Sequence, residues 1–215
     1  MRQVLLAVTV LIGSTPAAAQ VFEVGAGIGR GCIGDSSGFC GNETGPMLAT
    51  HASAWMADRF EIGLRLARLP RKSFGYTVPR DSRFDRVDDP AIRQMSRIAV
   101  GVRDRSRRIF AGEAIYHFAR GRPVRALLGL GLGEVINHFD HSCAPAGCER
   151  LMPIVASPVG KGSIVTGNLT IIAGVSGRIR ERLQVRGGVR LHNFAGEGAS
   201  TTEVFIATGY RFGRD

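Results

Sequence analysis

The chain has 215 residues, a length that fits one domain. Hydrophobic residues make up 44% of it, but beyond the N-terminus no apolar run reaches the length of a membrane-spanning helix, which needs about 20 residues. Lys and Arg number 28 against 18 Asp and Glu, so the net charge is +10 at pH 7, and 29 residues are glycine. A helical membrane protein is therefore excluded, and only a closed barrel of strands could cross a bilayer.

The first 19 residues have the order of a secretory signal. Arg2 gives a positive start, residues 4–12 are apolar apart from Thr9, and the alanines at 17–19 form an A-x-A cleavage site. The apolar run is too short for an anchor. We predict export, cleavage after Ala19 and a single mature domain of residues 20–215.

Eight later segments alternate between apolar and small or polar side chains with a period of two, which is typical of strands. They are residues 21–30, 47–56, 60–67, 110–118, 124–132, 164–177, 183–192 and 203–212. The segment 47–56 is the least regular, and Trp55 is expected at a membrane interface. Residues 98–103 are interpreted as a strand extension outside the membrane, and a ten-stranded alternative stays open.

The connections between these segments alternate in length. Short turns lie at residues 58–59, 120–123 and 180–182, and longer loops at about 31–46, 69–108, 140–162 and 195–200. Short periplasmic turns and long outer loops are the pattern of outer-membrane barrels. The sequence therefore predicts an all-β fold, an eight-stranded antiparallel up-and-down transmembrane β-barrel in the bacterial outer membrane.

The four cysteines form two close pairs, Cys32 with Cys40 and Cys143 with Cys148. Each pair encloses a short segment rich in small residues, and export places it where disulfides persist. We expect two local disulfides, although four cysteines allow three connectivities. The spacing does not match a zinc-ribbon pattern, so no metal site is expected. Both pairs fall in long loops on the same predicted side, which supports the topology.

Besides the signal segment, four short motifs stand out: Y-H-F-A-R-G-R-P at 116–123, L-G-L-G-L-G at 128–133, G-V-R-L-H at 188–192 and G-Y-R-F at 209–212. Through them the chain resembles the small outer-membrane β-barrel family, akin to the membrane domain of outer membrane protein A. The resemblance implies location and fold more than activity, because the family is functionally mixed. It also implies insertion by the barrel-assembly machinery, which reads a terminal aromatic residue. Here three residues, 213–215, follow Phe212.

On each predicted strand, one face carries the polar side chains, and it is predicted to face inward. Charges of both signs occur on this face. Its members are Glu23, Glu61, Arg65, Glu113, His117, Arg125, Arg186, Arg190, His192, Glu203 and Arg211. Charges in a narrow lumen need partners, so we predict a lumen ion-pair network and a closed or nearly closed channel. A structural role in filling the lumen is favoured over a gate. Glycines of the same parity would leave room for the arginines.

Enzymatic activity is not expected, since a hydrolase needs a nucleophile and a base within hydrogen-bond reach. The lipid A deacylase among small outer-membrane barrels has a His-Ser pair near the last strands. His192 is instead followed by Asn-Phe-Ala-Gly, and Ser200 lies in the loop. His138, Asp140 and His141 could hold a metal, but solvated loop histidines are the favoured interpretation. No cofactor is expected.

The loop 69–108 and its edges are rich in cations. They are Arg68, Arg71, Lys72, Arg80, Arg83, Arg86, Arg93, Arg97, Arg103, Arg105, Arg107 and Arg108, partly offset by Asp81, Asp85, Asp88, Asp89 and Asp104. A flexible polar loop is one interpretation. The other is binding to lipopolysaccharide phosphates or an anionic surface partner. An exported protein rarely meets nucleic acid, so membrane lipid is the expected partner, and a monomer is expected.

The favoured function is a structural or surface-interaction role in the outer membrane. One alternative is a lipid A-modifying barrel enzyme. Another is a soluble, lipocalin-like exported binding barrel, in which the apolar parity would face an internal cavity. The small residues on the polar parity favour the membrane barrel, as do Tyr116, Phe118, Tyr210 and Phe212 near strand ends, where interface girdles belong.

Overall fold

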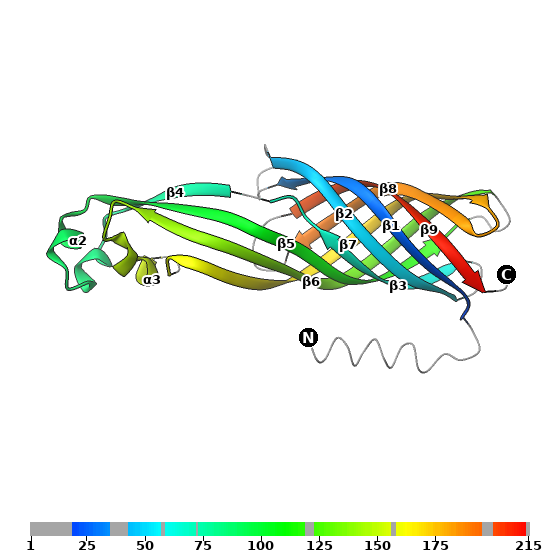
Figure 1. The fold of residues 1–215 in the computed structure, drawn as a ribbon, viewed down its shortest axis with the longest axis horizontal. Coiled ribbons are helices and arrows are strands. Elements are labelled where there is room, and N and C mark those ends of the chain that lie inside the picture. Colours follow the sequence, from blue (N-terminus) through cyan, green and yellow to red (C-terminus); the bar gives the residue numbers. More distant parts are fainter. Residues whose placement is uncertain are drawn as a thin grey trace. The chain divides into compact units, whose positions relative to one another are not determined.

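The computed structural model describes residues 19–34, 43–56, 59–71, 73–118, 123–155, 158–194 and 200–213. In chain order its elements are β1 (Ala19–Gly34), β2 (Glu43–Met56), β3 (Phe60–Arg68), β4 (Ser73–Pro79), η1 (Phe84–Arg86), α2 (Pro90–Gln94), β5 (Arg97–His117), β6 (Val124–Ala144), η2 (Cys148–Arg150), α3 (Met152–Val155), β7 (Gly160–Arg180), β8 (Leu183–Phe194) and β9 (Ser200–Gly213) (Figure 1). The apolar run of the predicted signal lies outside the described residues.

Eight of the described strands close into a barrel. They follow one another in the order β3-β2-β1-β9-β8-β7-β6-β5, and the pairing of β3 with β5 joins the two ends. The remaining strand, β4, pairs with residues 97–103 at the beginning of β5 and is not part of the closed ring. The predicted eight-stranded up-and-down barrel is confirmed, and the ten-stranded alternative is wrong.

The first and last strands of the barrel are neighbours. β1 and β9 are antiparallel, and their register runs from Val21 opposite Gly213 to Gly34 opposite Ser200. On its other edge β1 pairs with β2 over nearly the same length. No edge of β1 is therefore left open along this register, as barrel closure requires.

The two faces of the barrel strands differ sharply in polarity. Apolar side chains of one parity are exposed, for example Ile28 at 66%, Leu132 at 70% and Ile206 at 61%, whereas Glu23 and His117 of the other parity are fully buried. Such an apolar exterior around a polar interior is the arrangement of membrane barrels. The lipocalin-like alternative is wrong, because it required the apolar parity to face inward.

The described part of the chain divides into two compact units. The described residues within 19–69, 109–135 and 166–213 form the first, here called the barrel unit, and those within 70–108 and 136–165 form the second. Much of the predicted loops is regular structure. The segment 69–108 contains β4, η1, α2 and the beginning of β5, and the segment 140–162 contains the end of β6, η2 and α3.

The second unit has a hydrophobic core of its own. Phe84, Ile92, Ile98 and Leu151 are fully buried in it, together with Val78, Val100, Cys148 and Met152. Asp89 begins α2 and accepts a hydrogen bond from the Ala91 amide at 2.9 Å, which caps the helix. The second unit is therefore held together by buried apolar side chains as well as by strand pairing.

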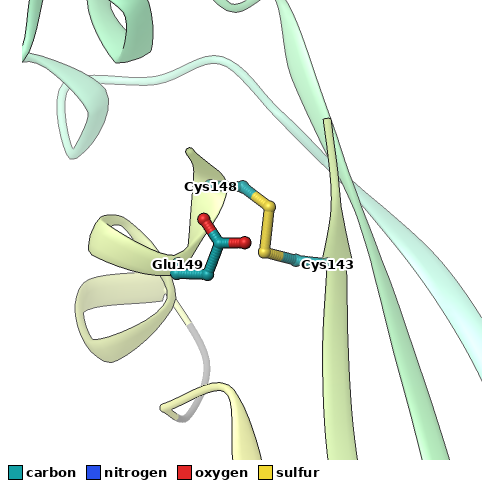
Figure 2. A group of neighbouring side chains, drawn as sticks. All are labelled: Cys143, Cys148 and Glu149. Carbon is teal, nitrogen blue, oxygen red and sulfur yellow. A yellow bond between two sulfur atoms is a disulfide. The ribbon is translucent and has the colours of Figure 1, made fainter. Parts of the chain in front are cut away.

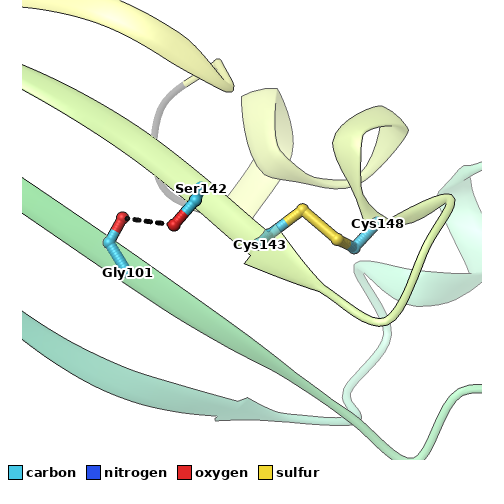
Figure 3. Close-up of a disulfide and its surroundings, with 4 residues drawn as sticks. All are labelled: Gly101, Ser142, Cys143 and Cys148. Carbon is cyan, nitrogen blue, oxygen red and sulfur yellow. Dashed lines mark hydrogen bonds between the residues drawn. A yellow bond between two sulfur atoms is a disulfide. The ribbon is translucent and has the colours of Figure 1, made fainter.

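The predicted disulfide between Cys143 and Cys148 is present, and it joins the end of β6 to η2 in the second unit (Figure 3). Next to Cys143 on β6, the Ser142 hydroxyl lies 3.5 Å from the carbonyl oxygen of Gly101 on β5. Cys32 is also disulfide-bonded. Its expected partner, Cys40, lies outside the described residues. Within the described part of the chain, no helix has the length and hydropathy to cross a membrane.

Candidate functional site in the barrel interior

Ion pairs join strands that are not neighbours in the sheet. Arg65 on β3 donates to both carboxylate oxygens of Glu203 on β9, at 2.6 and 2.7 Å. In the sheet, β2 and β1 lie between these two strands. The contact therefore crosses the lumen, because two intervening strands rule out a contact along the barrel wall.

One group of charges surrounds Glu203. Arg190 Nε lies 3.2 Å from Glu113 Oε1, and Arg190 Nη1 lies 3.7 Å from Glu203 Oε1. Arg65 Nε is 3.9 Å from the same Glu113 oxygen. His192 Nε2 approaches Glu203 Oε2 at 3.1 Å. All five side chains are buried, so two arginines, two glutamates and one imidazole share a single desolvated cluster.

A second group surrounds Arg186. Its guanidinium forms an ion pair with Glu23, and its Nη1 donates to Glu61 Oε1 at 2.9 Å. His51 Nε2 lies 3.1 Å from Glu23 Oε1, and His117 Nε2 lies 3.0 Å from Glu61 Oε2. One arginine thus bridges two carboxylates from strands β1 and β3, and each carboxylate has an additional imidazole.

The energetics of these clusters follow from burial. Removing a charged group from water costs several kcal/mol, and its partners offset this only when the geometry is good. Here each of Glu23, Glu61, Glu113 and Glu203 contacts at least one guanidinium. Deleting one partner would leave a charge buried without compensation, so the clusters fix which strand positions face each other.

Trp55 is buried at 3% exposure, so its expected place at a membrane interface is wrong. Its Nε1 donates to Glu23 Oε2 at 3.3 Å, and its ring lies 4.4 Å from the His117 ring. The physical reason is that successive side chains of a strand point to opposite faces. His51 and Ser53 are polar and on the same face of β2, so that face is the inward one, and Trp55 follows two residues later. This signal was available in the sequence.

Several other inward residues were not singled out from the sequence. Ser176 Oγ lies 3.1 Å from His117 Nδ1, and Thr170 Oγ1 lies 3.0 Å from His192 Nδ1. Each histidine therefore lies between a hydroxyl of β7 and a glutamate. Hydroxyl residues also occur throughout turns and caps, so only the strand register indicates which of them meet the imidazoles.

The hydroxyl–imidazole–carboxylate chain of Ser176, His117 and Glu61 has the composition of a nucleophile, a base and an orienting acid. The Thr170–His192–Glu203 chain repeats it in the other cluster. In both, the carboxylate is also bound by an arginine. This repetition favours a shared structural role, in which each imidazole satisfies two buried polar groups at once.

Arg125 and Arg211 lie at the end of the barrel unit where β5–β6 and β7–β8 are joined by short connections. Arg211 is buried, and its guanidinium lies 4.5 Å over the Trp55 ring. Arg125 is half-buried, and both residues line one small cavity.

Many arginines of the second unit are paired with aspartates. Arg80 and Asp85 are 2.6 Å apart, Arg93 and Asp88 are 3.0 Å apart, and Arg107 Nε lies 3.5 Å from Asp104. Arg83 also pairs with Asp81, and its side-chain hydrogen bond holds the pKa of Asp81 below the ordinary value. Arg97, Arg103 and Arg105 are exposed along β5.

The group of three potential metal ligands found among the described residues is Cys143, Cys148 and Glu149 (Figure 2). The two sulfur atoms are bonded to each other, so neither is available as a thiolate. His138, Asp140 and His141 do not gather into such a group within the described part of the chain. The His141 ring instead packs 4.4 Å from the Phe139 ring.

No protein-family model and no curated protein matches the chain. Solved structures share its fold at low sequence identity. Neisserial surface protein A is 15% identical with a TM-score of 0.56, and the match covers 89% of this chain and 97% of that one. The N-terminal β-barrel domain of Pseudomonas aeruginosa OprF is 12% identical with a TM-score of 0.52, over 91% and 100% of the two chains. Ail of Yersinia pestis is 11% identical with a TM-score of 0.51, over 90% and 99%.

Proposed function

We propose that the protein is a bacterial outer-membrane barrel with a closed or nearly closed lumen, and that its role is structural or in surface interaction rather than in solute passage. The cross-lumen ion-pair clusters carry this proposal. Arg65, Arg186 and Arg190 reach across the interior to glutamates on other strands, and all are buried. An eight-stranded barrel filled in this way has no room for a water-filled channel.

The exterior supports membrane insertion. Leu128, Leu130 and Leu132 on β6 are more than half exposed, and Ile206 and Val204 on β9 are too. Exposed aromatic pairs lie near strand ends, with the rings of Tyr116 and Phe118 5.0 Å apart and those of Tyr210 and Phe212 4.8 Å apart. An apolar band edged by aromatic residues matches the bilayer and its interfaces. Because a closed barrel leaves no strand edge in the lipid, we propose a monomer.

Cell fractionation and gel mobility test the location. The protein should be recovered with the outer membrane and should migrate differently before and after boiling in detergent, as closed membrane barrels do. Conductance across a planar bilayer tests the lumen, and no steady current is expected. Recovery in the soluble periplasm would contradict the location, whereas a steady current would contradict only the closed lumen.

We also propose that the second unit contacts lipopolysaccharide phosphates through its arginines, with Arg97, Arg103 and Arg105 as the main contributors. These three are exposed on one strand, whereas Arg80, Arg83 and Arg93 are engaged by aspartates. Guanidinium groups bind phosphate through paired hydrogen bonds. This surface would be positively charged where the loops face the outer leaflet.

The matched test compares two triple variants. Arg97→Gln, Arg103→Gln and Arg105→Gln together should weaken lipopolysaccharide binding and reduce its dependence on salt. Arg80→Gln, Arg83→Gln and Arg93→Gln together change the net charge equally but should have less effect. Equal loss in both variants would show a general charge effect, and unchanged binding in the first would contradict the proposal.

A further inference from the structure

Two short turns of the barrel unit are attached to a neighbouring strand in the same way. The turn before β3 contains Arg59, and the turn between β7 and β8 contains Arg182. The Arg59 carbonyl oxygen accepts a hydrogen bond from the His117 amide at 2.7 Å, and the Arg182 carbonyl oxygen accepts one from the Arg211 amide at 2.8 Å. In both cases the residue before the donating amide is a tyrosine. The two turns therefore hold an arginine at the same place relative to a tyrosine.

The side chains of these arginines also repeat one contact. Arg59 Nη1 donates to the Tyr116 hydroxyl at 3.3 Å, and Arg182 Nη1 donates to the Tyr210 hydroxyl at 3.4 Å. Both arginines are exposed, and a guanidinium has five N–H donors in a planar fork. A contact through Nη1 alone orients the group and leaves donors for a further acceptor.

Apolar side chains lie next to Tyr210 on the outside of the barrel. The Tyr210 ring centroid is 4.8 Å from that of Phe212, and in the register of β1 with β9 Val24 is opposite Tyr210 and Phe22 opposite Phe212. All four side chains are between 42% and 55% exposed. Tyrosines in such a position lie at the level of the lipid headgroups. A molecule that touched both Arg182 and these side chains would therefore have a polar and an apolar part.

An acidic residue accompanies the arginine in the turn between β7 and β8. Glu181 directly precedes Arg182, and both are exposed. The hydrogen bond to Tyr210 raises the pKa of Arg182, and the nearby Glu181 carboxylate adds to this. Because Glu181 would repel a ligand with negative charge alone, the turn suits a ligand that carries a positive group beside a negative one.

We propose that Glu181, Arg182 and Tyr210 bind the headgroup of a zwitterionic phospholipid, in which a phosphate and an ammonium group are adjacent. The Arg182 guanidinium binds the phosphate, and the Glu181 carboxylate binds the ammonium group. Phe212 and Phe22 contact the glycerol and the beginning of the acyl chains. Short connections of outer-membrane barrels face the periplasm, so the lipid belongs to the periplasmic leaflet. The inference rests on the membrane location of the barrel and is independent of a closed lumen.

A reporter placed at the site makes binding measurable. Phe212→Trp keeps an aromatic side chain there and adds an exposed indole. Trp55 is the single tryptophan of the sequence and is buried, so the unsubstituted protein gives its background signal. The folded barrel with Phe212→Trp is titrated in maltoside micelles with phosphatidylethanolamine or with phosphatidylglycerol, each brominated in its acyl chains. Bromine near the indole quenches its fluorescence, so quenching reports a lipid bound at this position.

Three further substitutions are made in the Phe212→Trp protein. Phosphatidylethanolamine should bind more tightly than phosphatidylglycerol before any of them. Arg182→Gln should weaken the apparent affinity for both lipids about fivefold, the size expected for one arginine at a membrane surface. Glu181→Gln should weaken phosphatidylethanolamine binding and strengthen phosphatidylglycerol binding, which removes the preference. Arg180→Gln removes the same charge as Arg182→Gln from an exposed position on β7 and should have a smaller effect.

Two results would overturn the proposal. One is equal affinity for the two lipids with Glu181 present, and the other is an equal effect of Arg182→Gln and Arg180→Gln. An excess of free phosphoethanolamine tests the source of the headgroup. It lacks acyl chains and should leave the quenching unchanged, whereas full recovery of fluorescence would assign the site to a soluble compound and overturn the assignment to lipid. Heat-modifiable mobility shows that each variant is folded, so a folding failure is not taken for a loss of binding.

Discussion

The Glu23 side chain lies directly against Gly209 of the neighbouring strand, and a Cβ added to Gly209 would be 2.8 Å from Glu23 Cγ. Glu23 in turn pairs with Arg186 and accepts a hydrogen bond from Trp55. The glycine therefore provides the space that lets a carboxylate enter the lumen at this level. Glu23 cannot move aside without losing these contacts, so the position requires the smallest residue.

Gly209→Ala should lower the free energy of unfolding by about 1–3 kcal/mol, the usual cost of overpacking a filled interior. Gly187→Ala is the matched control, because a Cβ there would meet its nearest atom, the Phe205 carbonyl oxygen, at an ordinary 3.4 Å. Denaturant titration of both variants in the same lipid gives the comparison. Equal effects at the two positions would show that the contact with Glu23 is not the cause.

Glu203→Gln should destabilise the barrel by about 3–5 kcal/mol, because it leaves Arg65 and Arg190 buried with less negative charge. Glu181→Gln is the control, since Glu181 is exposed in the turn between β7 and β8, where a substitution changes stability by less than about 0.5 kcal/mol. Denaturant unfolding measures both. A small effect of Glu203→Gln would mean that water reaches the cluster and compensates for the lost negative charge beside Arg65 and Arg190.

Ser176→Ala and Thr170→Ala should each cost about 1–3 kcal/mol, because each leaves a buried imidazole nitrogen without its hydroxyl partner. Neither hydroxyl should react with a fluorophosphonate probe. Mass spectrometry of the treated, folded protein checks this. Modification of Ser176 in wild type, lost in His117→Asn, would instead identify a serine hydrolase and overturn the structural interpretation.

Replacing both Cys143 and Cys148 by serine should affect the second unit alone, since the bond joins two positions within it. Limited proteolysis should cut residues 136–165 faster, while the gel mobility of the folded barrel stays as in wild type. This substitution leaves Cys32 and Cys40 intact, unlike chemical reduction. Loss of the heat-modifiable form would show that the second unit is needed for the barrel to fold.

Much of the fold followed from the sequence because strand alternation has a strict period. Leu183 to His192 alternates so regularly that its buried parity could be read directly. For residues 97–108 the sequence did not show which side chains face inward, because arginines occur on both faces of β5 there. In the sequence, the aspartates that pair with loop arginines could not be distinguished from the charges of a flexible loop. The core that contains Phe84 and Ile92 could not be predicted either, because it forms only in the tertiary fold.

The contacts inside the barrel could be predicted only in part from the sequence. Inward parity identifies which charges face the lumen, but not which meet, because partners such as Arg65 and Glu203 depend on strand tilt and register around the whole barrel. Trp55 was misplaced because an aromatic residue near a strand end suits either an interface or a filled lumen. The polar parity of His51 and Ser53 decides between the two.

The pairing of β1 with β9 has a consequence for the order of events in the cell. It joins the first and the last of the described strands, from Val21 with Gly213 to Gly34 with Ser200. Such distant contacts form late and slowly. The ring of eight strands cannot close until β9 is available, so the closed barrel forms only after all of its strands have been made.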